Sequence, residues 1–150
     1  MIEFLKSEDE GKVCKISEVA IFSRIDLLEI IYREKYDFLV NVQVINEAAC
    51  YGKLEVVKYL TESGASCSVN AMDFAAMNGH LKMVKFLHLN RSEGCDSALI
   101  DASFKGHFEV VKYLVENAIG MDFIQLAIDV ARRNGHLEIT EYLQDHMLVI

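Results

Sequence analysis

This 150-residue chain contains a thirteen-residue segment that is repeated at nearly constant intervals. Such a repeat limits the chain to very few architectures. The segment reads AACYGKLEVVKYL at 48–60, AAMNGHLKMVKFL at 75–87, ASFKGHFEVVKYL at 102–114 and ARRNGHLEITEYL at 131–143. A fainter copy, VAIFSRIDLLEII, occupies 19–31 and has a serine at the glycine position. Successive copies of that position lie 29, 27, 27 and 29 residues apart, at Ser23, Gly52, Gly79, Gly106 and Gly135. A fixed period of this length predicts a solenoid of stacked supersecondary units.

Each unit reads as a pair of helices. In the third copy, apolar residues recur at spacings of three and four on both sides of Gly106, which places each group on one face of a helix. Gly106 fits a tight turn between the helices, and His107 begins the second helix. An alanine four residues before each glycine lets neighbouring first helices approach closely. These alanines are Ala48, Ala75, Ala102 and Ala131.

The chain shows no strand pattern, so we expect an all-α solenoid of stacked antiparallel helix pairs. Three further glycines, Gly64, Gly94 and Gly120, follow the second helices and are typical of helix C-termini. After an N-terminal lead-in at 1–15, a single domain is predicted over 16–150. Its repeats are expected at about 16–42, 43–69, 70–96, 97–123 and 124–150. Polar residues at Arg132, Arg133, Thr140 and Glu141 suit the outer face of a terminal repeat.

These units resemble ankyrin repeats. The resemblance is carried by the alanine-rich first helix, the following Gly-His pair and the LEVVKYL-like second helix. The pair is present at Gly79-His80, Gly106-His107 and Gly135-His136, and it is replaced by Gly52-Lys53 once. Ankyrin repeats commonly have 33 residues and a Thr-Pro-Leu-His motif, whereas this chain has shorter repeats and no proline. The shortening implies β-hairpin fingers reduced to plain turns, and it is similar to the ankyrin arrays of protists and of the large DNA viruses that infect them.

Composition and charge narrow the classes of partner. Hydrophobic residues make up 52% of the chain and the formal net charge is −8. A negative charge disfavours nucleic acid, which requires a basic surface, and it disfavours an anionic membrane surface. The four cysteines form no CxxC pair, and the N-terminus does not read as a signal peptide. Free thiols and an intracellular, cytoplasmic location are therefore expected, in the host cytoplasm if the protein is viral.

The residues give no basis for catalysis, and neither a metal nor a cofactor is expected. His80, His107 and His136 recur regularly, but consecutive repeats would hold them about 10 Å apart, too far to share one zinc ion. A structural role is favoured, in which each imidazole bonds to backbone groups of the turn before its helix. The aspartates are scattered without a paired-carboxylate spacing, and no nucleophile motif is present. We expect a protein that is not an enzyme.

The resemblance implies a concave face, lined by first helices and turns, that binds another protein. Carried over to this sequence, the contact candidates lie just before the glycines. They are Tyr51, Met77, Asn78, Phe104, Lys105, Arg133 and Asn134. For Met77 and Phe104, a place in the core of the first helix is an equally good interpretation.

A protein-interaction module is the function that this resemblance favours. Two alternatives stay open: an inhibitor or scaffold that blocks an enzyme such as a kinase, and an attachment or targeting subunit of a larger assembly. The acidic N-terminus or the apolar tail at 147–150 would supply the attachment point. A monomer is expected, with weak self-association through that tail as the alternative.

Overall fold

The computed structural model describes residues 42–65, 68, 70–90 and 97–147. The predictions for the lead-in, the first repeat, Cys14, Cys67, Gly94 and Cys95, and the last three residues of the tail lie outside these ranges. Contacts divide the chain into two compact units, Met1–Ser68 and Val69–Ile150. Each unit is described by itself.

The described part of the first unit is one helix pair, α3 (Val42–Cys50) and α4 (Leu54–Glu62), which pack against each other. Its interior contains apolar side chains from both helices, all fully buried. These are Val44, Ile45, Ala48 and Ala49 from α3, and Val56, Val57 and Leu60 from α4. After α4, the Ser68 hydroxyl donates a hydrogen bond of 2.7 Å to Asn46 Oδ1, which ties the following segment back to α3.

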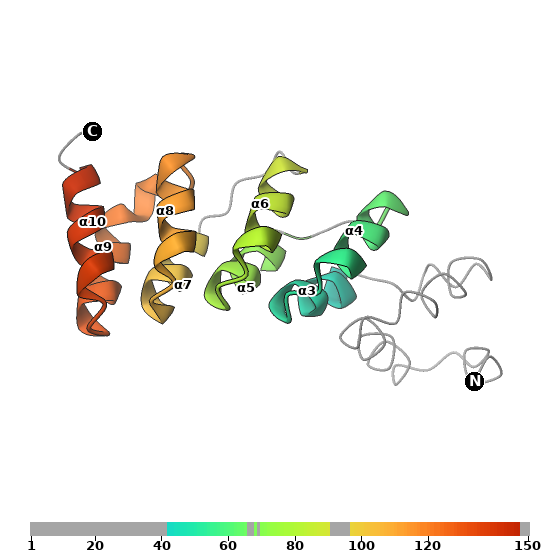
Figure 1. Ribbon diagram of the computed structural model, residues 1–150, viewed down its shortest axis with the longest axis horizontal. Coiled ribbons are helices and arrows are strands. Elements are labelled where there is room, and N and C mark those ends of the chain that lie inside the picture. The colour runs from blue at the N-terminus through green and yellow to red at the C-terminus, as the bar shows by residue number, and fades with distance from the viewer. Residues whose placement is uncertain (1–41, 66–67, 69, 91–96, 148–150) are drawn as a thin grey trace. The chain divides into compact units, whose positions relative to one another are not determined.

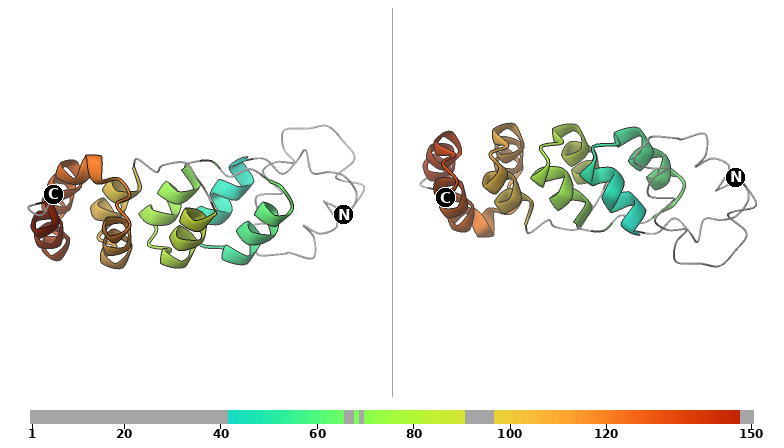
Figure 2. Two further views of the ribbon diagram at one scale, coloured as in Figure 1. Left: turned by 90° about the horizontal axis from the view of Figure 1, so that it is seen from above. Right: turned by 90° about the horizontal axis from the view of Figure 1, so that it is seen from below.

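The second unit contains three helix pairs. They are α5 (Asn70–Met77) with α6 (Leu81–Leu89), α7 (Ala98–Lys105) with α8 (Phe108–Glu116), and α9 (Ile124–Arg133) with α10 (Leu137–Met147). Within this unit the first helices α5, α7 and α9 pack side by side, and the second helices α6, α8 and α10 form a second row (Figure 1). The two views of Figure 2 show these three pairs following one another in chain order. This arrangement is the predicted stack of antiparallel helix pairs.

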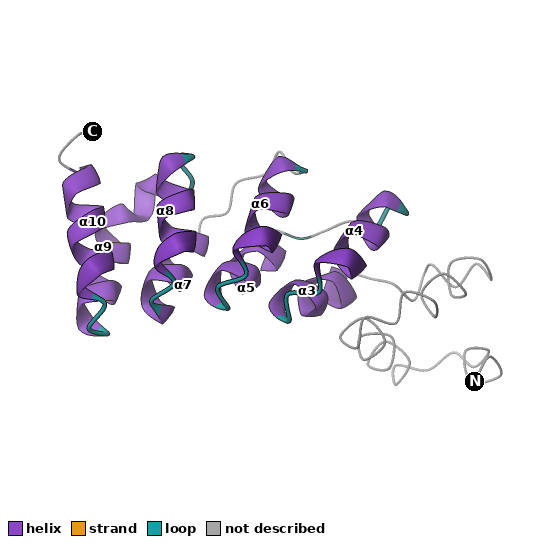
Figure 3. Cartoon of the chain, in the orientation of Figure 1, coloured by secondary structure: helices purple, strands orange, loops and turns teal. Residues whose placement is uncertain are grey.

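The predicted fold class is confirmed, since the described residues form helices, turns and loops with no strand (Figure 3). Between α8 and α9, a turn at 117–120 and the short 3-10 helix η3 (Met121–Phe123) stand where a longer repeat would project a β-hairpin. The finger is therefore reduced to a turn, as the short period predicts.

The first helices end in the same backbone motif, which explains the repeated alanine and glycine. The three glycines of the second unit, Gly79, Gly106 and Gly135, have φ of +74°, +79° and +78°. In each repeat the N–H of the following histidine bonds to the carbonyl of the alanine four residues before the glycine, at 2.9 Å. The N–H groups of Gly79 and Gly135 bond to the next carbonyl along, those of Ala76 and Arg132, whereas the Gly106 N–H shares the Ala102 carbonyl. This is the Schellman arrangement, in which glycine takes the left-handed conformation without a steric cost.

The second helices end differently from the prediction in one place. Gly64 takes the left-handed position after α4, with φ +89°, as expected. After α8 the equivalent position is Ala118, with φ 54°, because the Ile119 N–H bonds to the Leu114 carbonyl just as the Ala65 N–H bonds to the Leu60 carbonyl. The prediction that Gly120 ends α8 is therefore wrong. Gly120 also has a positive φ, of 72°, but it precedes η3.

A second correction concerns Thr140, whose polarity predicts a place on the outer face. Its position is the one held by Val84 and Val111 in the two preceding repeats, and it is only 6% exposed. Its hydroxyl donates to the His136 carbonyl at 3.0 Å, one turn earlier in α10. The polar atom is thus satisfied locally, and the rest of the side chain packs as valine does.

Candidate functional site

A contact between a histidine and a glycine joins successive repeats of the second unit. His107 Nε2 lies 3.0 Å from the Met77 carbonyl oxygen, and His136 Nε2 lies 3.0 Å from that of Phe104. A carbonyl only accepts, so Nε2 carries the hydrogen and donates it. The sequence predicts that each imidazole bonds to the turn before its own helix. For these two histidines the acceptor instead lies in the preceding repeat.

The glycines leave the room that these imidazoles occupy. A Cβ added to Gly79 would lie 2.7 Å from His107 Nδ1, and one added to Gly106 would lie 2.5 Å from His136 Cε1. Both distances are far below a normal van der Waals contact. The turn of each repeat therefore sits directly against the turn of the next, which aligns the C-terminal ends of α5, α7 and α9.

This alignment creates a common face on the first helices. Residues nine, five and two positions before each glycine fall on one side of their helix, because these spacings of four and three return to the same face. We refer to their surface as the first-helix face. Its members are Asn70, Phe74 and Met77 on α5, Ser97 immediately before α7, Asp101 and Phe104 on α7, and Leu126, Val130 and Arg133 on α9.

Large apolar side chains are exposed on this face. Phe74 is 37% exposed, Phe104 is 44% exposed and Leu126 is 48% exposed. Phe104 is thus outside the core, so the interpretation of this residue as a core residue is wrong. Met77 is half-buried. The remaining predicted contact of this row, Arg133, is exposed as well.

The residues immediately before the glycines border the first-helix face. Asn78 and Asn134 are exposed, and their side-chain amides donate to the Phe74 and Val130 carbonyls at 2.8 and 2.7 Å. These amides therefore satisfy carbonyls at the ends of α5 and α9. Lys105 is also exposed, and its Nζ lies 5.5 Å from the centre of the Phe104 ring. In the first unit, the remaining candidate Tyr51 is 57% exposed beside its own glycine turn.

Asp101 lies at the centre of the first-helix face, and reasoning from the sequence missed it. Its carboxylate is half-buried and makes no hydrogen bond or ion pair with another described residue. Burial raises the pKa of this carboxyl above its ordinary value of 3.8. One signal was available: the equivalent positions of the adjacent repeats hold the apolar residues Phe74 and Val130. Asp101 is therefore the only acid at this position in the second unit, although Glu47 holds the same position in the first unit.

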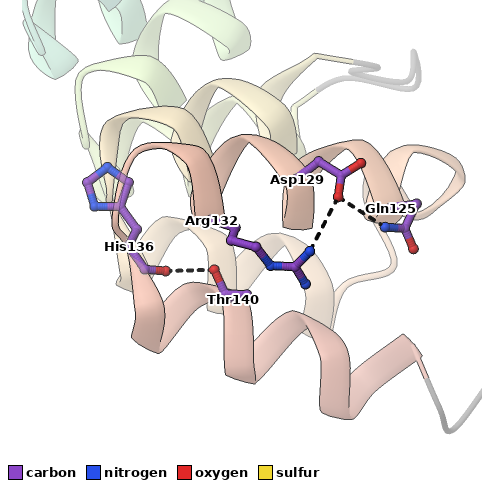
Figure 4. A network of polar contacts seen from close by, with 5 residues as sticks. All are labelled: Gln125, Asp129, Arg132, His136 and Thr140. Atoms are coloured by element: carbon purple, nitrogen blue, oxygen red, sulfur yellow. Dashed lines mark hydrogen bonds and ion pairs between the residues drawn. The ribbon is translucent and has the colours of Figure 1, made fainter.

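The outer side of α9 is polar. Asp129 accepts a hydrogen bond from Gln125 Nε2 at 3.3 Å and faces Arg132 Nη1 at 3.9 Å (Figure 4). Arg132 occupies the position that Ala76 and Ser103 hold in the earlier repeats, where both are fully buried. A long charged side chain there gives the last repeat a solvated surface, as expected for a terminal repeat.

The described residues were compared with the requirements of a metal site and of a membrane-spanning helix. They contain no group of three or more His, Cys, Asp or Glu side chains placed to hold a metal ion. None of the helices that the structure describes is long and apolar enough to cross a membrane.

Comparison with known proteins agrees with the geometry. A family model described as ankyrin repeats (3 copies) matches residues 45–126 and 72–149, well over half of the chain. A search of curated proteins finds no match. Ankyrin repeats generally act as protein–protein interaction modules and are typically not enzymes. From its repeats, its helix pairs and this match, the chain belongs to the ankyrin-repeat family.

Proposed function

We propose that this protein binds another protein through the first-helix face of its second unit. One observation carries the proposal: Phe74, Phe104 and Leu126, from three adjacent helices, present 37%, 44% and 48% of their surface to solvent on one aligned face. Aromatic and large apolar side chains grouped on one surface are the usual anchors of protein interfaces.

The mechanism is presentation by a preformed surface. The Gly–His contacts hold α5, α7 and α9 in fixed positions, so a partner does not have to organise this face when it binds. Preorganisation of this kind lowers the entropic cost of association. Arg133 on this face and Lys105 at its border add charged contacts. We also propose Tyr51 as a contact on the first unit, since it is exposed next to an equivalent turn.

The proposed setting is a reducing, intracellular one. The half-buried Cys50 forms no disulfide with another described residue, and thiols outside disulfides are typical of compartments in which thiols are kept reduced.

The test compares two double variants that remove exposed apolar surface from different faces. A partner is isolated by affinity capture on the wild-type protein, purified, and titrated calorimetrically. Phe74→Ala with Phe104→Ala should weaken binding by about a hundredfold, or roughly tenfold per anchor. Leu89→Ala with Leu137→Ala is the control, since both side chains are exposed on second helices, at 80% and 65%.

The control should bind like the wild type, and both variants should keep the helical circular dichroism signal. Equal affinity for all three proteins would reject the first-helix face. A loss confined to the control would move the interface to the second helices.

A further inference from the structure

We propose that the first-helix face binds a basic side chain of its partner, with the Asp101 carboxylate as the counter-ion and the Phe74 and Phe104 rings beside it. This inference rests on the proposed function and specifies the chemistry of the partner: an arginine or lysine within an apolar segment of a protein.

The placement of Asp101 is the first step. It lies five residues before Gly106, as Phe74 does before Gly79 and Val130 before Gly135, so these three residues occupy equivalent positions on adjacent helices. Phe104 follows Asp101 by three residues and lies on the same side of α7. Asp101 therefore has apolar residues at its own position on both neighbouring helices and one turn further along its own helix.

The second step is the electrostatic state of this carboxylate. It is partly withdrawn from water, and within the described ranges neither a hydrogen-bond donor nor a cation compensates it. The raised pKa expresses the same cost, since desolvation disfavours the charged form. An ion pair with a cation of the partner would offset this desolvation cost of the carboxylate on binding.

The neighbouring charges do not already supply that cation. Lys105, four residues after Asp101, is the nearest basic residue on α7, but its Nζ lies over the Phe104 ring and not within 4.0 Å of the carboxylate. Arg133 on α9 makes no ion pair with a described residue. Asp129, one residue before this row on α9, already faces Arg132 at 3.9 Å and therefore adds little to the potential at Asp101. The net charge of −8 favours a basic partner.

The rings determine the kind of cation. Phenylalanine rings attract cations over their faces. The Phe104 ring is 44% exposed and already has Lys105 Nζ at 5.5 Å from its centre. A guanidinium can stack on a ring while it donates two hydrogen bonds to a carboxylate, whereas an ammonium cannot. Arginine is therefore the preferred residue. A metal ion is disfavoured, because a single carboxylate does not provide a coordination sphere.

The experiment selects ligands from random peptide sequences. A phage-displayed library of such peptides is panned against the folded full chain and, in parallel, against Asp101→Asn. Asp145→Asn is the matched control, because it removes the same charge from an exposed position on α10. Peptides selected on the wild type and on the control should be enriched in arginine next to aromatic or aliphatic residues. Those selected on Asp101→Asn should lack this enrichment.

A selected peptide is then titrated by fluorescence anisotropy. Asp101→Asn should weaken binding about tenfold, and replacing the arginine of the peptide by glutamine should weaken wild-type binding to the same extent. The two changes together should cost no more than one alone, since they remove the same ion pair.

The outcomes separate this inference from the proposed function. Peptides that bind less tightly to Phe104→Ala but equally to wild type and Asp101→Asn refute the ion pair and leave the first-helix face as the binding site. Peptides indifferent to both variants refute the face itself. A selection that returns no wild-type binder counts against both proposals.

Discussion

Two separate constraints act on Gly79 and Gly106 at the scale of the single residue. Each has a left-handed backbone, which costs other residues about 1–2 kcal/mol, and each lies against the imidazole of the next repeat. Gly135 has the same backbone conformation, with φ +78°, but no atom of the described residues lies within 4 Å of where its Cβ would be. The chain therefore contains a natural control for the second constraint.

We predict that Gly106→Ala is more destabilising than Gly135→Ala. The second change should cost about 1–2 kcal/mol from the backbone alone. The first should cost about 1 kcal/mol more, because the new methyl displaces the His136 ring and breaks its hydrogen bond to Phe104. Urea denaturation followed by circular dichroism measures both. In a Gly106→Ala, His136→Ala double variant the extra cost should not add, and equal losses for the two single variants would contradict the account.

We predict that Asp101→Asn stabilises the protein at about pH 7 and that this advantage declines as the pH falls. Burial raises the folded-state pKa of Asp101 above the ordinary value of 3.8, so the native state binds this proton more tightly than the unfolded state does. Ionisation therefore costs stability as the pH rises through the interval between the two pKa values, and the full cost remains above it. Below about pH 3.8 both states are protonated, and this contribution disappears. Urea denaturation of the wild type and of Asp101→Asn from about pH 7 down to about pH 3.8 measures the difference between their free energies of unfolding. A difference that stays constant with pH would contradict the prediction.

How far single residues could be predicted depends on where their partners lie. The turn glycines and the alanines four residues before them followed from the sequence, because their reasons are local to one turn. The acceptors of His107 and His136 did not follow, since each lies about 30 residues earlier and depends on how the repeats align. Asp101 was missed for the same reason: its apolar surroundings come from neighbouring helices.

At the scale of the helix, the C-terminal ends follow a common hydrogen-bonding pattern. Four of the described helices end at an asparagine whose amide donates to the carbonyl four residues earlier. These asparagines are Asn78, Asn90, Asn117 and Asn134. After α8, however, the left-handed position that follows the asparagine is filled by Ala118.

We predict that Ala118→Gly stabilises the protein. The substitution removes a left-handed penalty of about 1–2 kcal/mol from the folded state. It also makes the unfolded chain more flexible, which opposes folding by about 0.4–1 kcal/mol. The net gain in the free energy of unfolding is roughly 0.5–1 kcal/mol. The reciprocal change, Gly64→Ala, should be destabilising through conformation alone, because nothing in the described part of the chain lies within 4 Å of the added Cβ. Thermal unfolding provides the measurement, and a lower melting temperature for Ala118→Gly would contradict this account.

Helix existence was predictable from periodicity, whereas this helix end was not. Gly120 attracted the prediction because glycine is the usual left-handed residue, but the hydrogen bonds of Ala118 and Ile119 close α8 two residues earlier. Alanine leaves no mark of a left-handed backbone in a sequence. Thr140 is a similar case, since its polarity suggested solvent although its hydroxyl is satisfied within α10.

At the scale of the molecule, the three helix pairs of the second unit share one interior. The buried side chains of α5, α7 and α9 meet those of α6, α8 and α10 along the whole unit. The stacking of these helix pairs followed from the sequence, because the apolar residues of each pair recur at spacings of three and four and predict one buried face on each helix.

We predict that residues 69–150 fold without the first unit. Three stacked repeats are enough to bury a continuous core, and the polar group of Asp129 and Arg132 already protects one end. The isolated fragment should show helical circular dichroism and a single cooperative unfolding transition, at a lower temperature than the full chain. A random-coil spectrum would show that this unit depends on the rest of the chain.

The Gly–His contact also bears on how such an array can change in length over evolution. The pair α7–α8 carries both halves of the contact: His107 enters the space at Gly79, and Gly106 receives His136. A tandem gene duplication that copies one such pair in frame would reproduce both junctions without any compensating substitution. Gly79 and Gly106 are 27 residues apart, Gly106 and Gly135 are 29 apart, and the same Gly–His contact forms at both junctions. The longer step contains the longer first helix, since α9 has ten residues and α7 has eight. Small insertions at the start of a first helix are therefore accommodated, while the array itself grows or shrinks by whole repeats.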